Sequence, residues 1–336
     1  MLATCTGIGQ ISIRTHHLLH SRIMKPGRVL PGVLQRAIGD WAHSPEECLA
    51  AGGADGRAWL ARLPLMIETL CRRWDLHLAD DVDPRHGYHG LVLTVHHSGA
   101  RYVLKLTWPP AKSVAEAHAL ATWNGEGAVH LVASNTPMGA LLLEHLDPTR
   151  TLTSLPIAEA ATIAGRLLRR LAVPVPEGFP NLRTIAGDIA CSLAPRQERF
   201  GHPVPRHWLE EAQRLADAFA RSAQRDVLVH ADLHYGNVLA GGREPWLAID
   251  PRPIAGEPEH AVPELLWARI DELRDAAEIQ QLLATVVDAG MLDAETARKW
   301  VVVRGVDYWL WGLEHGLTED PKRCARLLNA FVSPLS

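Results

Sequence analysis

The spacing of apolar residues along the chain predicts where its first elements lie. Beyond residue 59 apolar side chains recur every three or four positions, at Leu60, Leu63, Ile67, Leu70 and Trp74. This spacing is typical of an amphipathic helix. Since proline is tolerated only in the first turn of a regular helix or at a kink, we expect the regular part to run from Pro64 to about Asp75. Extended segments at 91–96 and 101–107, joined through His97-Ser98-Gly99, then predict a β-hairpin.

The rest of the N-terminal half is predicted to complete a small antiparallel sheet with one helix. Ser113 would cap a helix that runs to Trp123, and Glu116, three residues after the cap, would complete a capping box. Two more strands are expected at 130–133 and 140–143, on either side of a turn-forming segment that contains proline and glycine.

The C-terminal half has mainly helical spacing. Helices are expected at 158–171 and 208–223, and again from about residue 251 to the C-terminus. Two apolar extended segments, 227–230 and 246–250, interrupt the helices. The pattern therefore predicts an α+β protein with a small antiparallel-sheet N-lobe and a larger, mainly helical C-lobe.

Length and composition fit two lobes and exclude several classes of function. Of the 336 residues, 47% are apolar, and we assign 1–54 to a poorly defined extension, 55–146 to the N-lobe and 147–336 to the C-lobe. A net charge of -4 provides no basic face for nucleic acid. The five cysteines are scattered, and no apolar run approaches the roughly 20 residues of a membrane-spanning helix. We expect a cytoplasmic protein without a nucleic-acid or membrane partner, and no protein partner is evident.

The most informative motif lies between residues 227 and 250. An apolar strand leads into His230 and Asp232, and Asn237 follows five residues after the aspartate, so the motif is H-x-D-x-x-x-x-N. A second apolar strand then ends at Asp250-Pro251. This layout matches the catalytic loop and the metal-binding aspartate of kinases.

Phosphoryl transfer needs these residue types because negative charge lies on the transferring oxygens. Asp232 would face the acceptor hydroxyl and accept its proton, and His230 would scaffold the loop. Asn237 and Asp250 would supply oxygen ligands to Mg²⁺ bridging the phosphates of ATP. In the plainer interpretation Asp232 and Asn237 are ordinary turn residues around Gly236, which explains the joint pattern less well.

Lys105 lies in an otherwise apolar strand, where its charge needs a partner. Glu116, on the helix that follows, would be that partner. In kinases a strand lysine contacts the phosphates of the nucleotide and is held by a carboxylate from the following helix, and this chain has the same order of strand, loop and helix. In the alternative, Lys105 is a surface residue of an edge strand and Glu116 only completes the capping box.

Two further segments could contact the nucleotide. Gly87-Tyr88-His89-Gly90 precedes the strand at Leu91 in the place of a phosphate-covering loop, but it lacks G-x-G-x-x-G and fits a plain turn equally well. The segment 141–146 ends the small sheet at the predicted lobe junction. Its backbone groups, around Glu144 and Leu146, could bind adenine, or the segment could serve core packing alone.

Together these residues resemble the aminoglycoside phosphotransferase family, and within it the branch of streptomycin 6-kinases and hydroxyurea phosphotransferases. The resemblance covers about residues 56–329. It implies a two-lobed protein-kinase-like fold, dependence on ATP and Mg²⁺, and O-phosphorylation of an antibiotic, with a streptomycin-like aminoglycoside expected first. The segments typical of this branch are 56–60, 103–106, 123–129, 141–144 and 306–317.

One position departs from the family pattern. After Pro258 the family usually has an aspartate that braces the catalytic loop, and this chain has Ala261 there. His260, Glu259 or Glu264 could replace the brace; otherwise, the enzyme would be slow or reduced in its capacity for phosphorylation.

The acceptor site is predicted from the chemistry of a polycationic sugar, which favours carboxylates and flat aromatic faces. Asp307, Trp311 and Glu314 fall roughly on one face of a helix, and Asp271 is a further candidate. In the plainer interpretation the tryptophan is core and the carboxylates are solvated. Two other functions stay open: a housekeeping kinase for a sugar or amine on the same fold, and a non-catalytic kinase-like protein that binds nucleotide.

Overall fold

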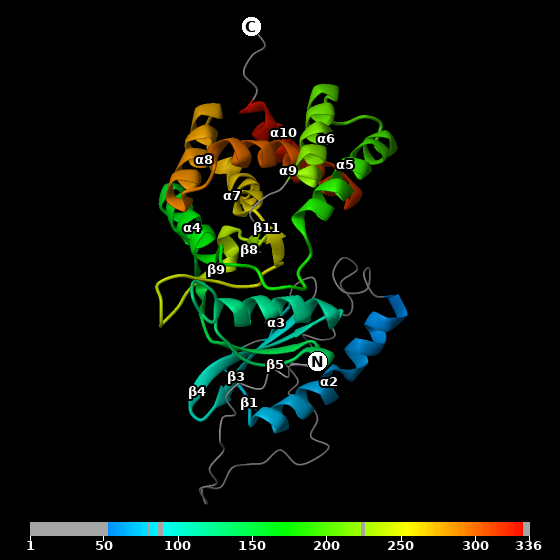
Figure 1. Cartoon of the computed structure of the whole chain (residues 1–336). Coiled ribbons are helices and arrows are strands. Elements are labelled where there is room, and N and C mark those ends of the chain that lie inside the picture. Colours follow the sequence, from blue (N-terminus) through cyan, green and yellow to red (C-terminus); the bar gives the residue numbers. More distant parts are fainter. Residues whose placement is uncertain (1–52, 80, 83, 87–89, 223–225, 332–336) are drawn as a thin grey trace, which may run out of the picture.

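An antiparallel sheet of six strands forms the N-lobe (Figure 1). The computed structural model describes residues 53–331 apart from positions 80, 83, 87–89 and 223–225, so all but the last two residues of the predicted extension 1–54 and most of the glycine segment 87–90 lie outside the described residues. The strand order is β1-β3-β4-β6-β5, with β2 paired to β3. The strands are β1 (His77–Leu78), β2 (Arg85–His86), β3 (Gly90–His97), β4 (Ala100–Thr107), β5 (Leu131–Asn135) and β6 (Ala140–Glu144).

The predicted hairpin is confirmed as β3 and β4, which pair from Gly90 opposite Thr107 to His97 opposite Ala100. The turn between them places Ser98 and Gly99 at positive φ, the conformation that a tight hairpin loop requires. Each of the four predicted N-lobe strands is present, with ends shifted by one or two residues.

Two helices cover opposite faces of this sheet, with α3 on the side of the C-lobe (Figure 1). Helix α2 spans Gly53–Trp74 and contains Pro64, so the prediction that the regular helix starts at Pro64 is wrong. Helix α3 spans Ala111–Trp123 after Pro110, and no side chain caps it. The predicted capping box is therefore also wrong: Ser113 is inside the helix and its hydroxyl donates to the Pro110 carbonyl at 2.7 Å.

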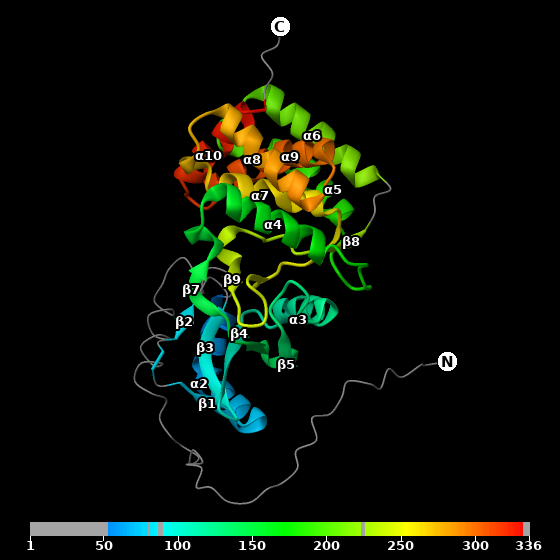
Figure 2. The same ribbon diagram turned by 90° about the vertical axis from the view of Figure 1, so that its left-hand side faces the viewer.

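The helices of the C-lobe pack against one another mainly in pairs, and the two helices of a pair are not always consecutive in sequence (Figure 2). The helix at 182–199, which interleaves small, polar and charged residues, had no prediction. An aromatic stack of Phe219 on Trp300, with ring centroids 4.1 Å apart, joins two of the helices in the core. The helices are α4 (Ile157–Leu171), α5 (Leu182–Arg199), α6 (Arg206–Arg221), α7 (Val262–Trp267), α8 (Ala276–Gly290), α9 (Ala294–Glu314) and α10 (Glu319–Asn329).

Short strands lie between the helices and the N-lobe, and they hold the motif loops (Figure 2). One sheet has the order β10-β9-β7 and the other pairs β11 with β8. No helix in the described part of the chain is long and apolar enough to cross a membrane. The short strands are β7 (Asp147–Thr151), β8 (Val227–Val229), β9 (Val238–Ala240), β10 (Leu247–Ala248) and β11 (Ile254–Gly256).

Candidate active site

Lys105 lies in β4, with paired strands on both sides, so it is not an edge residue. Its neighbours Leu104 and Leu106 are fully buried in the core beneath α2. Because side chains alternate along a strand, Lys105 is on the other face. There its ammonium donates to both carboxylate oxygens of Glu116, at 2.7 and 2.9 Å. The lysine is 9% exposed and Glu116 4%, so this is a buried ion pair between the sheet and α3.

Asp250 joins this pair from the C-lobe, with its Oδ1 2.6 Å from the Lys105 ammonium. Burial alone would lower the pKa of Lys105, but the carboxylates of Glu116 and Asp250 outweigh burial and raise it. The lysine is therefore charged at neutral pH. Asp250 has φ 56°, a conformation that non-glycine residues adopt at a cost and that is common in active sites.

The catalytic loop begins where β8 ends, and His230 is its internal support. The His230 ring accepts from the Asp232 amide through Nδ1 at 3.4 Å and contacts the Ile249 carbonyl through Nε2 at 3.0 Å. Since a carbonyl can only accept, Nε2 bears the proton. Complete burial lowers the pKa of His230 to about 4. The ring is thus a neutral group that ties the catalytic loop to the segment before Asp250.

Asp232 lies at the tip of this loop with 17% of its side chain exposed. Burial, reinforced by the charge of Glu264, raises the pKa of Asp232 to about 7, although Arg252 acts in the opposite direction. Ala231, just before it, has φ 54°. The loop thus presents a partly desolvated carboxylate whose proton affinity suits a base at neutral pH.

Asn237 is placed beside Asp250 by the β9–β10 pair. The two strands pair Val238 with Ala248, and the Ile249 amide donates to the Asn237 carbonyl at 2.9 Å. The Asn237 side-chain amide donates to the Asp232 carbonyl at 2.9 Å, so its Oδ1 is the side-chain atom that could accept a ligand. Among the described residues no three His, Cys, Asp or Glu side chains form a metal cluster.

Comparison with known proteins agrees with this arrangement. A sequence profile described as "Aminoglycoside/hydroxyurea antibiotic resistance kinase" matches residues 73–316. The chain belongs to this family. It is thus a kinase that phosphorylates hydroxyl groups, as the sequence predicted.

Similar proteins include two with different acceptors in their names. A hydroxyurea phosphotransferase of Kitasatospora aureofaciens is 37% identical over 298 residues, covering 86% of this chain and 85% of the relative. A streptomycin 6-kinase of Streptomyces glaucescens is 38% identical over 277 residues, covering 79% and 88%. The crystal structure of aminoglycoside phosphotransferase APH(4)-Ia covers 80% of this chain and 99% of its own, with a TM-score of 0.54 at 15% identity. That similarity confirms the predicted two-lobed kinase-like fold.

In the kinase, an ion pair links the two lobes at their junction. Glu144, at the end of β6, accepts from the His130 amide at 2.7 Å and from the Arg243 guanidinium at 2.8 Å. Leu146 is buried beside it. The segment is therefore both packed and hydrogen-bonded, and whether its backbone binds adenine stays a prediction.

The residues around Ala261 form their hydrogen bonds outside the catalytic loop, although the charge of Glu264 acts on Asp232. Ala261 is fully buried. Glu259 accepts from the Asp293 amide at 2.8 Å, and Glu264 pairs with Arg304 at 3.2 Å. His260 is buried against the edge of the Trp300 ring. The loop is instead anchored through its own Tyr235, whose hydroxyl donates to the Leu265 carbonyl of α7 at 3.0 Å.

The predicted acceptor carboxylates are all paired with arginines. Asp307 and Glu314, on α9, both contact Arg196 of α5, at 2.6 and 3.1 Å. Asp271 contacts Arg323 at 2.6 Å. Trp311 is 39% exposed and stands in a stack with Tyr308 and His315, at 5.3 and 4.0 Å between ring centroids.

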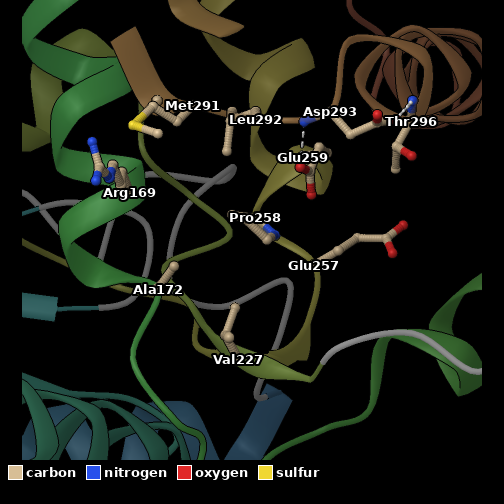
Figure 3. A pocket seen from close by; sticks show the side chains of 11 residues that line it. Arg169, Ala172, Val227, Glu257, Pro258, Glu259, Met291, Leu292, Asp293 and Thr296 are labelled. Carbon is tan, nitrogen blue, oxygen red and sulfur yellow. Dashed lines mark hydrogen bonds between the residues drawn. The ribbon is translucent and has the colours of Figure 1, made fainter. Parts of the chain in front are cut away.

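A separate pocket of about 560 Å³ lies in the C-lobe (Figure 3). It is lined by the end of α4, by β8 and by the connection between α8 and α9. Arg169 and Met291 lie on one side of it and Glu257 on the other, with the Glu257 side chain pointing away from them (Figure 3). Neither Lys105 nor Asp232 is among its lining residues.

Besides Arg323 on Asp271, sequence reasoning missed the arginines that pair with the other site residues: Arg252 on Asp232, Arg243 on Glu144, and Arg196 on Asp307 and Glu314. Arg252 had a local signal, because it follows Asp250 by two residues between two prolines. Arg243 and Arg196 are about 100 residues from their partners in sequence, and no spacing indicates such a pair.

Proposed function

We propose that this kinase transfers the γ-phosphoryl group of ATP, held with Mg²⁺, to a hydroxyl of a streptomycin-like aminoglycoside. The observation that supports it best is that Lys105, Asp250 and Asp232, from three separate segments, gather where the N-lobe and C-lobe meet. Lys105 is held by Glu116 and contacts Asp250 at 2.6 Å. Asp232 lies on the same loop as His230, whose ring bonds both the Asp232 amide and the carbonyl of Ile249, the residue before Asp250.

Residues 55–146 would bind the nucleotide and residues 147–336 the acceptor. The Lys105 ammonium would contact the α- and β-phosphates, and Glu116 would hold its direction. The backbone of the segment from Leu141 to Leu146, next to Glu144, would bind adenine. A buried lysine with a carboxylate on either side is a rigid, fully charged group, as phosphate binding requires.

The oxygen atoms at the loop ends fit a magnesium ion. Asp250 offers a carboxylate that is 57% exposed, and Asn237 offers its Oδ1. Hard oxygen ligands with several positions left for phosphates and water are what Mg²⁺ prefers. When bound, the ion would neutralise charge on the phosphates.

Asp232 would act as the base, with His230 as the scaffold that orients it. As the acceptor oxygen forms its bond to the γ-phosphorus, the bond from that phosphorus to the β-bridging oxygen breaks and ADP leaves. The hydroxyl proton passes to the Asp232 carboxylate. The raised pKa of about 7 makes Asp232 a stronger base than an exposed aspartate while it is still ionised at mildly alkaline pH.

The acceptor is proposed from the relatives and from the C-lobe surface. One relative named above is a streptomycin kinase and another a hydroxyurea phosphotransferase. Trp311 offers a stacked aromatic face, and a cationic acceptor would compete with Arg196 and Arg323 for the carboxylates Asp271, Asp307 and Glu314. Hydroxyurea is uncharged and small, so it would not use such a surface.

An acceptor panel tests this proposal. Enzyme and MgATP would be incubated with streptomycin, other aminocyclitol antibiotics, hydroxyurea and simple sugars, and the products analysed by mass spectrometry. We expect streptomycin phosphate as the main product. Clear phosphorylation of hydroxyurea or a sugar without streptomycin phosphate would reject the aminoglycoside assignment, and no product with any acceptor would favour the non-catalytic alternative.

A further inference from the structure

Arg252 forms an ion pair with the Asp232 carboxylate, which is the group proposed to bind the acceptor hydroxyl. Its Nε lies 3.1 Å from Oδ2 of Asp232, and 72% of its side chain is exposed. Ion pairs with so exposed a partner are weak and contribute little to folding. A structural role therefore does not explain why a guanidinium faces the catalytic loop at this point.

The backbone of Arg252 is fixed, so only its side chain can move. Strands β8 and β11 pair Val229 with Ile254, and continuation of this register brings Arg252 opposite the start of the catalytic loop. The Arg252 amide donates to the His230 carbonyl at 2.9 Å. Pro251 and Pro253, on either side, are buried and restrict the backbone further. The arrangement is a long cation on a rigid base beside Asp232 and Asp250.

A second cation, on the N-lobe, acts electrostatically on Arg252 and Asp250. Lys112 is exposed in the first turn of α3. Burial, and then the charge of Arg252, lower the pKa of Lys112, while Asp250 acts in the opposite direction. Lys112 and Arg252, from different lobes, thus act electrostatically on one another and on Asp250, which is proposed to bind the phosphate-bridging metal. Like charges in such proximity favour an anion between them.

We propose that Arg252 binds the transferring phosphoryl group: its guanidinium leaves Asp232 for the γ-phosphoryl oxygens of ATP, which frees the carboxylate for the acceptor hydroxyl. This inference rests on the proposed function and adds a residue to it. Arg252 donates hydrogen bonds and transfers no proton, so the bonds made and broken are those of phosphoryl transfer alone. The planar guanidinium matches the equatorial oxygens of that group. Its interaction with these oxygens is strongest when their negative charge is greatest.

The test compares Arg252→Gln and Arg252→Lys with wild type. Titration calorimetry would measure binding of MgADP with aluminium fluoride, which imitates the transferring group, and of Mg²⁺ with the non-hydrolysable analogue AMP-PNP. For Arg252→Gln we expect about 10²–10³-fold weaker binding of the aluminium fluoride complex and less than about tenfold for AMP-PNP. Arg252→Lys should recover part of the loss because it keeps the charge.

Arg206→Gln is the matched control, because Arg206 is also a highly exposed, ion-paired arginine, on α6. It should bind both complexes like wild type. Equal binding of the aluminium fluoride complex by wild type and Arg252→Gln would overturn the inference, and so would equal losses for the two complexes. Neither titration needs an acceptor, so a failed acceptor panel would reject the aminoglycoside proposal without deciding this one.

Discussion

Ionisation of Asp232 should destabilise the folded protein, and Asp232→Asn should remove that effect. Burial raises the pKa of this carboxyl from 3.8 to about 7. Because the folded-state pKa is above the unfolded one, the fold favours the protonated form. The stabilising contribution is therefore complete below about pH 4 and is lost as the pH rises through about 7.

The size of the effect follows from the two pKa values. A difference of about three pH units between folded and unfolded states corresponds to about 4 kcal/mol of unfolding free energy. Only 17% of the Asp232 side chain is exposed, so solvent screens this energy weakly. Asparagine has nearly the same shape and no charge, so the Asp232→Asn variant does not lose this unfolding free energy as the pH rises.

Urea unfolding followed by tryptophan fluorescence would measure this, without nucleotide or Mg²⁺, between pH 4.5 and 8.5. Subtracting the wild-type unfolding free energy from that of Asp232→Asn cancels the other titrating groups. The difference should grow with pH by up to about 4 kcal/mol, with most of the change between pH 4.5 and 7.5. A difference that is constant with pH, or that falls as the pH rises, would refute the reasoning.

Three further predictions follow from the contacts. Asp250→Asn should weaken binding of Mg²⁺–nucleotide and lower turnover together, because a ligand to the metal loses its charge; unchanged affinity in calorimetry would remove the metal role. Asp307→Asn should raise the KM for the acceptor several-fold with kcat nearly unchanged, whereas a lower melting temperature with unchanged KM would restrict Asp307 to its ion pair with Arg196. Ala261→Asp should lower stability without raising turnover, because the site is fully buried and Tyr235 already holds the loop; faster turnover would show that a brace is missing.

The sequence predicted elements whose signal is local. The hairpin β3–β4 and the helix α4 follow from alternation and helical spacing within a few residues. The start of α2 was misjudged because Pro64 is accommodated within the helix. The capping box at Ser113 failed because helix α3 already begins after Pro110. Helix α5 lacks a clear apolar stripe, since it interleaves small and charged residues, and it was not predicted.

For the site, the sequence indicated which residues gather but not what they contact. Lys105, Glu116 and Asp250 were identified from motif order, and the three do meet. The ion pair of Arg252 with Asp232 depends on the pairing of β8 with β11, which spacing alone does not specify. The pairing of Asp307 and Glu314 with Arg196 likewise depends on how α5 packs against α9. Long-range packing decides such contacts, and a single sequence contains little information on it.

The turnover of Asp232→Asn tests the central claim most directly. Initial rates with saturating MgATP and the best acceptor of the panel would be compared with wild type, alongside calorimetry of AMP-PNP binding. If Asp232 is the catalytic carboxylate, turnover should fall by about 10²–10⁴-fold while nucleotide affinity stays the same. Turnover within a few-fold of wild type, with the protein folded and nucleotide bound, would contradict the account and place the base elsewhere.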